Sequence, residues 1–384
     1  MLLSLIVYIG MGLMLFYLGW HYNRRVQFNS LSGTTKSFLT SWEIMVSIAL
    51  FTLIAALRYH TGWDHEDYII DYTAYQNKGL ILRDNFEIGF SLVKIIFAKL
   101  GLHYSVFFGF WGFLNIFFLY LGLKDNPRVI PWVGLFVMLG IFFVHLMNTI
   151  RQGVVECGFV LLVMLLGHKK WVWYFVGALI LCTIHKSAFL IIPLYLLIKY
   201  PFPIKKSHTL VIIYIVCLLL GQFSVFSWIM NSFSGVLEVL GYSKYVELFN
   251  TNPTYAFHKT SLGVTTLIQI ALHLSVICYY GKMKDYFGNP VFFLNCFKLT
   301  FLYCCAFVLL LNTTIYVKRP CELFLPFFLI CSAYLSAYFY ENKKYVELLT
   351  FVILECSIII FTLLKEHFIS KLADSVNYYH FIPF

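Results

Sequence analysis

The chain has 384 residues, of which 60% are hydrophobic and only 12% are charged. Soluble proteins are nearer to half apolar and a quarter charged, so this composition excludes a soluble globular fold and predicts a membrane protein. The net charge of +10 is divided among short clusters between apolar segments, which argues against a nucleic-acid-binding module.

Apolar segments of about twenty residues recur along the chain, and each is long enough to cross a hydrocarbon layer of roughly 30 Å. The first segment lacks a basic N-terminal region and a small-residue cleavage site, so we interpret it as a retained span and not as a signal peptide. The predicted full spans are residues 2–20, 41–57, 103–123, 129–147, 150–166, 208–229, 262–280, 291–311, 320–340 and 346–364.

Two apolar segments differ from a simple span. Residues 87–100, EIGFSLVKIIFAKL, are short and contain two lysines, so we expect an interfacial helix there. Residues 171–199 have basic clusters at both ends, and the chain must turn back between them if both clusters face the cytoplasm. The turn falls at His185-Lys186-Ser187, with arms of about 13 or 14 residues, near 20 Å of helix each. We therefore expect His185 at the mouth of a cavity in the outer leaflet.

The basic residues predict the orientation. Lys and Arg prefer cytoplasmic loops, and the clusters are Arg24-Arg25, Lys169-Lys170, Lys205-Lys206, Lys282 with Lys284, and Lys343-Lys344. With these loops inside, the N-terminus is outside. We expect one integral membrane domain over residues 1–384, with an extracytoplasmic acidic loop and interfacial helix at 58–102 and a second extracytoplasmic loop at 230–261.

Three arginines stand at predicted helix ends on this extracytoplasmic face: Arg58, Arg151 and Arg319. Arg151 and Arg319 are expected near helix N-termini, where free N–H groups favour anions. Since the guanidinium fork matches phosphate oxygens bidentately, three such groups are suited to a diphosphate. Each can instead extend to the lipid headgroups, and Arg319 can pair with Glu322 at i+3.

The loop after Arg58 is rich in acids, since six of the eighteen acidic residues of the chain lie between Arg58 and Glu87. A carboxylate can act as general base toward a sugar hydroxyl, and Asp64 is our first candidate for that role. Asp64, Glu66 and Asp67 also have the spacing to hold a divalent metal, and a solvated acidic loop is the plain alternative. Tyr68, Tyr72 and Tyr75 recur at helical spacing among these acids, which suits carbohydrate and is equally common at a membrane interface.

Other ionisable residues have less specific surroundings. His185 can relay a proton, with Ser187 two residues on, or can be structural. Glu355 and Lys298 fall inside predicted spans and are expected to make interior contacts. The ten cysteines lie almost entirely in apolar stretches, so we expect small buried side chains, no disulfide framework and no zinc site.

The motifs RYHTGWDHEDYIIDY, FEIGFSLV, IRQGVV, IHKSAFLIIPLY and KRPCELFLP, in this order, resemble those of the EpsG family. These are Wzy-like polysaccharide polymerases of bacterial capsule, exopolysaccharide and O-antigen pathways, and the resemblance extends over about residues 40–384. It implies an all-α, GT-C-like bundle of roughly 12 transmembrane helices, with short or re-entrant helices on the extracytoplasmic side.

The resemblance also implies an activity, a glycosyl transfer from one undecaprenyl-diphosphate-linked oligosaccharide to a sugar hydroxyl of another, at the outer face of the bacterial inner membrane. Its substrates are lipid-linked oligosaccharides, its surroundings are membrane lipids, and its expected protein partner is a chain-length regulator. No metal or other cofactor is expected. Ile88 departs from the pattern, because many members have proline there.

Carried over to this sequence, the family pattern assigns these roles: catalysis to Asp64, Glu87 and His185, with Ser187 in the H-x-S motif, and diphosphate binding to Arg58, Arg151 and Arg319. Tyr68, Tyr72 and Asp67 are the expected sugar contacts. A glycan ligase has the same donor chemistry, and a lipid-linked oligosaccharide flippase is also polytopic. A flippase commonly contains internal repeats, and none is evident in this sequence.

Overall fold

The computed structural model describes residues 2–29, 35–82, 86–140, 142–201, 206–222, 263–288, 290–313, 315–369 and 378–382. The second predicted extracytoplasmic loop, residues 230–261, therefore lies outside the described residues. Within them the chain is almost wholly helical, and six helices are long and apolar enough to cross a membrane, or seven if one bent pair is a single span. These observations support an all-α polytopic membrane protein; the bundle of about 12 spans stays a prediction.

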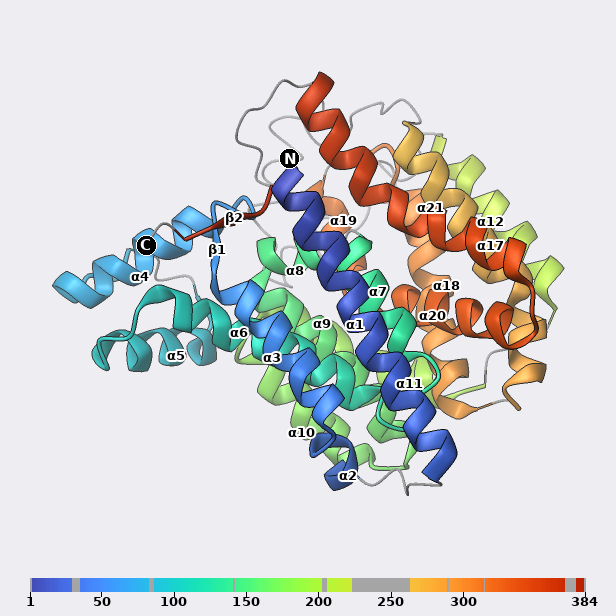
Figure 1. Cartoon of the computed structure of the whole chain (residues 1–384), viewed down its shortest axis with the longest axis horizontal. Helices are drawn as coiled ribbons and strands as arrows, with labels where there is room; N and C mark the ends of the chain where they lie inside the picture. Colours follow the sequence, from blue (N-terminus) through green and yellow to red (C-terminus); the bar gives the residue numbers. More distant parts are fainter. Residues whose placement is uncertain are drawn as a thin grey trace. The chain divides into compact units, whose positions relative to one another are not determined.

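Contacts divide the chain into two compact units, Met1–Tyr200 with Ser332–Phe384, and Pro201–Cys331 (Figure 1). The helices of the first unit are α1 (Leu2–Asn29), α2 (Thr35–Leu39), α3 (Trp42–Ala56), α4 (His65–Lys78), α5 (Ile88–Lys99), α6 (Tyr104–Gly122), α7 (Ile130–Leu139), α8 (Phe142–Asn148), α9 (Ile150–Gly167), α10 (Trp171–Cys182), the 3₁₀ turn η1 (Lys186–Leu190), α11 (Ile191–Lys199), α21 (Tyr345–Leu364) and the π turn η2 (Lys365–Ile369). The second unit contains α12 (Ser207–Gln222), α17 (Val264–Tyr286), α18 (Val291–Leu309), α19 (Ile315–Glu322) and the beginning of α20 (Leu325–Glu341).

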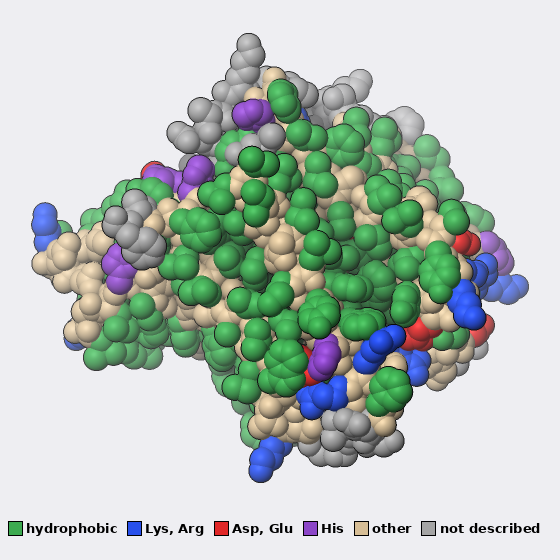
Figure 2. Space-filling model, in the orientation of Figure 1, with side chains coloured by type: hydrophobic (Ala, Val, Ile, Leu, Met, Phe, Trp, Pro, Cys, Tyr) green, Lys and Arg blue, Asp and Glu red, His purple; other side chains and the backbone are tan. Residues whose placement is uncertain are grey.

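Small residues bring the helices of the first unit close together. In this unit α1 packs on α3 and α7, while α6 packs on α3 and α9. A Cβ at Gly19 of α1 would lie 2.9 Å from the backbone of Pro131, and a Cβ at Gly112 of α6 would lie 2.4 Å from the Cβ of Ala55. Glycine at such contacts is characteristic of membrane helices, whose association depends on close packing. Hydrophobic side chains cover most of the face in Figure 2.

Several predicted spans have different bounds in the structure. The first helix continues beyond residue 20 to Asn29, because its polar end is held by the buried carboxylate of Glu43. That carboxylate accepts hydrogen bonds from Arg25 at 2.9 and 2.7 Å and lies 2.8 Å from the ring of His21. The predicted span 129–147 is two helices, α7 and α8, bent by 63°.

The predicted span 320–340 is also wrong at its beginning. Helix α20 begins at Leu325, because Pro326 fits the first turn of a helix, where its missing N–H costs nothing. Arg319 therefore lies in the last turn of a separate short helix, α19, and not at a helix N-terminus as predicted.

The reversal predicted within residues 171–199 is confirmed. Helix α10 ends at Cys182, and the chain returns through η1 and α11. The rings of Phe175 and Tyr195 lie 4.9 Å apart, and the Tyr174 hydroxyl donates a hydrogen bond of 2.6 Å to the carbonyl of Ile191. Two arms that are each too short to span the bilayer thus form a hairpin.

Helices α4 and α5 lie side by side in Figure 1 and are joined by buried polar contacts. The ammonium group of Lys94 donates to a carboxylate oxygen of Asp71 at 2.6 Å, and both residues are 2% exposed. Nearby, the Tyr72 hydroxyl donates to the carbonyl of Leu102 at 2.7 Å. With 12 residues, α5 is shorter than a span, and its interfacial position stays a prediction.

The second unit has its own core, in which α12 packs against α17 and α18. Its centre is His273, which is 1% exposed and whose Nδ1 lies 3.1 Å from the Tyr214 hydroxyl. Lys298 and, in the first unit, Glu355 are both buried, as expected for ionisable residues inside spans.

The α4–α5 ion pair gives a stability prediction. Replacing Lys94→Met leaves the Asp71 carboxylate buried without its cation, and we expect a loss of about 3–5 kcal/mol in the free energy of unfolding. The double variant Asp71→Leu with Lys94→Met should recover most of that loss, since no charge remains buried. Unfolding of the purified protein in detergent measures both effects.

The matched control is Arg128→Met, which breaks the exposed pair with Glu341. It should cost about 1 kcal/mol or less. Equal losses from the Lys94 and Arg128 variants would contradict a buried ion pair.

Candidate functional site

The segment after α3 is held on two sides. Its strand β1 (Arg58–Tyr59) pairs antiparallel with β2 (His380–Phe381), and the Thr61 hydroxyl donates to the carbonyl of Tyr378 at 3.0 Å. On the other side Gly62, with φ +98°, lies against the end of α8, where a Cβ would be 2.9 Å from the carbonyl of Met147. Only glycine suits both this conformation and this contact.

Arg58 lies inside this segment and is 1% exposed. Its guanidinium donates to the sulfur of Met147 and lies 4.7 Å from the ring centre of Phe108. Among the described residues, its Nε and Nη2 have no hydrogen-bond partner. Burial lowers the pKa of Arg58 to about 9, while Tyr379, Tyr68 and other tyrosine hydroxyls oppose that shift, so the group is charged at neutral pH. Because an unpaired buried charge is costly, a cation in such a position is suited to bind an anion.

Arg151 is the second residue of α9 and contacts two other segments of the chain, α4 and the beginning of α5. Its Nη1 donates to one carboxylate oxygen of Glu87, and its Nε donates to the hydroxyl of Tyr68 at 3.4 Å. The guanidinium lies 4.4 Å from the ring centre of Phe86 and 5.2 Å from that of Phe90. The side chains of Arg151 and Glu87 are 18% and 16% exposed, so the pair is enclosed but not sealed.

The hairpin between α10 and α11 contacts Glu87 as well. The second carboxylate oxygen accepts the backbone N–H of Lys186 at 2.9 Å, and the N–H of Gly89 donates to the carbonyl of Thr183 at 2.7 Å. A Cβ at position 89 would lie 2.5 Å from the Thr183 hydroxyl, so glycine is required for this approach. Glu87 thereby ties the hairpin to α9.

His185 points its Nδ1 at its own hairpin. This nitrogen accepts the backbone N–H of Ser187 at 3.3 Å and lies 2.8 Å from the Ser187 hydroxyl. A backbone N–H can only donate, so Nδ1 is an acceptor and the proton of the neutral ring is on Nε2. In this arrangement the neutral ring of His185 has its donor at Nε2, and its acceptor nitrogen, Nδ1, is engaged by Ser187.

Asp64 immediately precedes α4, and its backbone N–H donates to the side-chain oxygen of Asn148 at 3.3 Å. Tyr68, four residues later, is on the same face of the helix as Asp64. Because Tyr68 contacts Arg151, the segment that carries Asp64 lies beside the arginine–glutamate pair.

We define the α9 cluster as Arg58, Asp64, Tyr68, Glu87, Arg151 and the hairpin residues 185–187. The sequence singled out all of these residues except Lys186, whose contribution is a backbone N–H. Arg319 lies in the second unit, so the predicted third arginine stays a prediction.

The other expected residues are placed less favourably. Tyr72 is buried, with its hydroxyl bonded to Leu102, and Glu66 pairs with His60 at 2.7 Å on the surface. Asp67 is exposed in the first turn of α4. Within the described part of the chain, no three His, Cys, Asp or Glu side chains converge as metal ligands would, and Asp64, Glu66 and Asp67 are included in that statement.

Two features of the site were missed by the sequence interpretation. Phe86 and Phe90 form aromatic plates beside Arg151, and their i, i+4 spacing around Glu87 was the available signal. A buried cluster also lies behind Arg151, where Glu156 accepts a hydrogen bond from Gln152 and lies within 2.9 Å of His145 Nε2. Gln152 and Glu156 are again spaced i, i+4.

The site yields a prediction for acid stability. Burial, together with the neighbouring Arg58 charge, lowers the pKa of His65 from 6.5 to about 3. Below pH 6.5 the unfolded chain binds a proton here and the folded chain does not, so the free energy of unfolding falls by about 1.4 kcal/mol per pH unit. His65→Phe retains a ring stacked on Phe108 and should remove this slope, measured by thermal unfolding between pH 7 and pH 4.

The exposed His208 is the matched control, and His208→Phe should leave the acid slope of the wild type unchanged. An unaltered slope in the His65 variant would refute the assignment.

The comparison with known proteins identifies the family of the chain. The sequence pattern of the EpsG family matches residues 42–383, which include every segment of the α9 cluster. No curated protein and no solved structure matches the chain. Because the match extends over almost the whole sequence, the chain belongs to the EpsG family, the family of Wzy-like polysaccharide polymerases.

Proposed function

We propose that this protein joins lipid-diphosphate-linked oligosaccharide units into a bacterial surface polysaccharide. In this proposal the α9 cluster is the active site, faces the exterior of the plasma membrane and is of the GT-C type. Family membership supports polysaccharide polymerisation in general. The observation that supports the site is the convergence of Arg151, Glu87, Tyr68 and the 185–187 hairpin from four separate segments.

For the donor, the protein mainly has to neutralise the negative charge of the leaving diphosphate and does not have to form a covalent bond to the sugar. When the anomeric carbon–oxygen bond breaks, the lipid diphosphate leaves with the bonding electrons and its negative charge grows. Arg151 is the first group to meet that charge, with the Nε2–H of His185 as a second donor. Glu87 and the aromatic plates fix the orientation of the guanidinium beforehand. Arg58 and Arg319 are proposed as further cationic contacts for the diphosphate.

The acceptor sugar needs a base. Its hydroxyl oxygen forms the new glycosidic bond, and the hydroxyl proton passes to a carboxylate. Asp64 is the proposed base, because Glu87 is already engaged by Arg151 and by the Lys186 N–H. His185 presents a proton-bearing nitrogen, which makes it less suited to accept another. Tyr68 and Asp67 are proposed to contact the sugar.

The decisive experiment replaces Arg151→Ala in the native host and measures polysaccharide chain length on gels. Removing a preorganised donor to a leaving group costs about 10²–10³ in rate, so long polymer should disappear and single repeat units should accumulate. Asp64→Asn should give the same product, because it keeps the shape of the side chain and removes the base.

Arg128→Ala is the control for loss of a guanidinium, since Arg128 is half exposed and pairs with Glu341 outside the cluster. It should make polymer of normal length. Full-length polymer from the Arg151 variant would refute the site, and accumulation of repeat units only on the cytoplasmic leaflet would indicate a flippase instead.

A further inference from the structure

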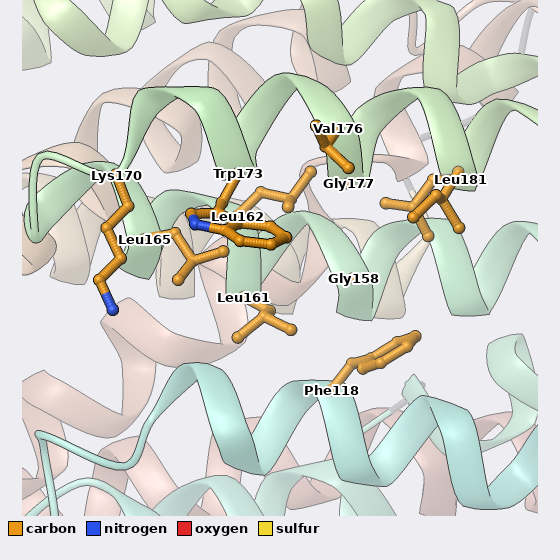
Figure 3. A pocket seen from close by; sticks show the side chains of 11 residues that line it. Phe118, Gly158, Leu161, Leu162, Leu165, Lys170, Trp173, Val176, Gly177 and Leu181 are labelled. Atoms are coloured by element: carbon orange, nitrogen blue, oxygen red, sulfur yellow. The ribbon is translucent and has the colours of Figure 1, made fainter. Parts of the chain in front are cut away.

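We propose that an anionic phospholipid binds in a slot on the first unit, with one acyl chain between α6 and α10 and its phosphate at Lys170. The slot is a cavity of about 410 Å³ with α9 along its length (Figure 3). Its lining includes Phe118 of α6, Leu161 and Leu165 of α9, and Trp173 and Val176 of α10. A volume of this size is within the range of small-molecule and lipid-chain sites.

The shape of the slot fits an alkyl chain. Along α10 it extends from Lys170 to Leu181, which is about 16 Å at 1.5 Å per residue. Its walls are almost wholly apolar, so a polar ligand would lose its hydrogen bonds to water without replacement there. An extended hydrocarbon chain loses nothing in the same place.

The charge at one end selects the headgroup. Among the described residues, Lys170 is the only ionisable one that lines the slot, and in Figure 3 its ammonium group lies at the end of the row of apolar side chains. The neighbouring carboxylate of Asp125 is already bonded to His168 at 2.7 Å and to Lys124 at 2.9 Å. No carboxylate pairs with Lys170 in the described ranges. Lys169 adds a second cation, so the mouth favours an anionic phosphate over a zwitterionic headgroup.

Helix α10 connects the slot to the α9 cluster. Lys170 immediately precedes α10 and Trp173 is in its first turn, and the hairpin beyond its last turn provides the Lys186 N–H bonded to Glu87. A lipid that fixes α10 against α9 therefore fixes the hairpin as well. This regulatory consequence rests on the proposed function, whereas lipid binding does not.

Trp173 provides a direct probe of binding. The protein is reconstituted in phosphatidylcholine vesicles that contain a minor fraction of either brominated phosphatidylglycerol or brominated phosphatidylcholine. Bromine on the acyl chain quenches tryptophan fluorescence at contact. The chain has eight tryptophans, and the difference in quenching between wild type and Trp173→Phe gives the contribution of Trp173 alone. We expect about fivefold greater occupancy by phosphatidylglycerol, the effect of one lysine at an anionic surface.

Matched variants separate slot binding from general lipid contact. Trp171→Phe removes a tryptophan that is similarly exposed but does not line the slot, and should leave the phosphatidylglycerol preference intact. Lys170→Ala should abolish the preference, and Lys343→Ala, at an exposed lysine of another loop, should not. Val176→Phe should reduce Trp173 quenching by filling the slot, whereas Leu179→Phe on the exposed face of α10 should not.

The outcomes are distinct. Equal quenching of Trp173 by both lipids would overturn the headgroup assignment, and stronger quenching by a brominated polyprenyl phosphate would assign the slot to a substrate tail instead. Normal polymer from Lys170→Ala, with the lipid preference lost, would refute the regulatory part alone. A polymerase assignment that fails in the Arg151 experiment leaves the quenching result untouched.

Discussion

The fold of the first unit depends on a carboxylate that is satisfied from two directions. Glu87 accepts the guanidinium of Arg151 from α9 and the backbone N–H of Lys186 from the hairpin. In an enclosed, low-dielectric setting such charged hydrogen bonds are strong, and an unmatched partner would be costly. One side chain thus fixes the relative positions of α5, α9 and the turn after α10. The surrounding aromatic rings of Phe86 and Phe90 hold the guanidinium without competing for its donors.

This arrangement explains how a mostly apolar chain retains a polar site. Polar groups at the ends of membrane helices are stable where they satisfy one another, and here they come from segments far apart in sequence. Arg58 differs from Arg151, because it is 1% exposed and packs against Phe108 and Met147, whereas the side chain of Arg151 is 18% exposed. Both arginines interact with Tyr68. Its hydroxyl accepts a hydrogen bond from Arg151, and it opposes the lowering of the Arg58 pKa. Their roles are therefore coupled without being equivalent.

Much of this organisation could be predicted from the sequence, because apolar length and basic clusters report membrane spans directly. The reversal at His185 followed from the basic clusters at both ends of residues 171–199, and the motifs assigned both Glu87 and Arg151 to the site. Backbone contributions could not be predicted, since the N–H of Lys186 has no signature in residue type. Local breaks were also missed, because Pro326 reads as part of an apolar run until its place in the first turn of α20 is seen. The strand pair β1–β2 could not be predicted, because a strand of two residues is too short to show the alternation of polar and apolar side chains.

That strand pair has a consequence for biogenesis. Thr61 and Tyr378 are separated by 317 positions in the chain, yet they are hydrogen-bonded on the segment that contains Arg58. Membrane helices are inserted in order during synthesis. The segment after α3 therefore cannot pair with β2 until the helices between them have been synthesised. The strand that pairs with Arg58 is synthesised only after helices α4 to α21. A nascent chain stalled before β2 would be inserted but immature, and quality-control proteases would meet it with that loop still open.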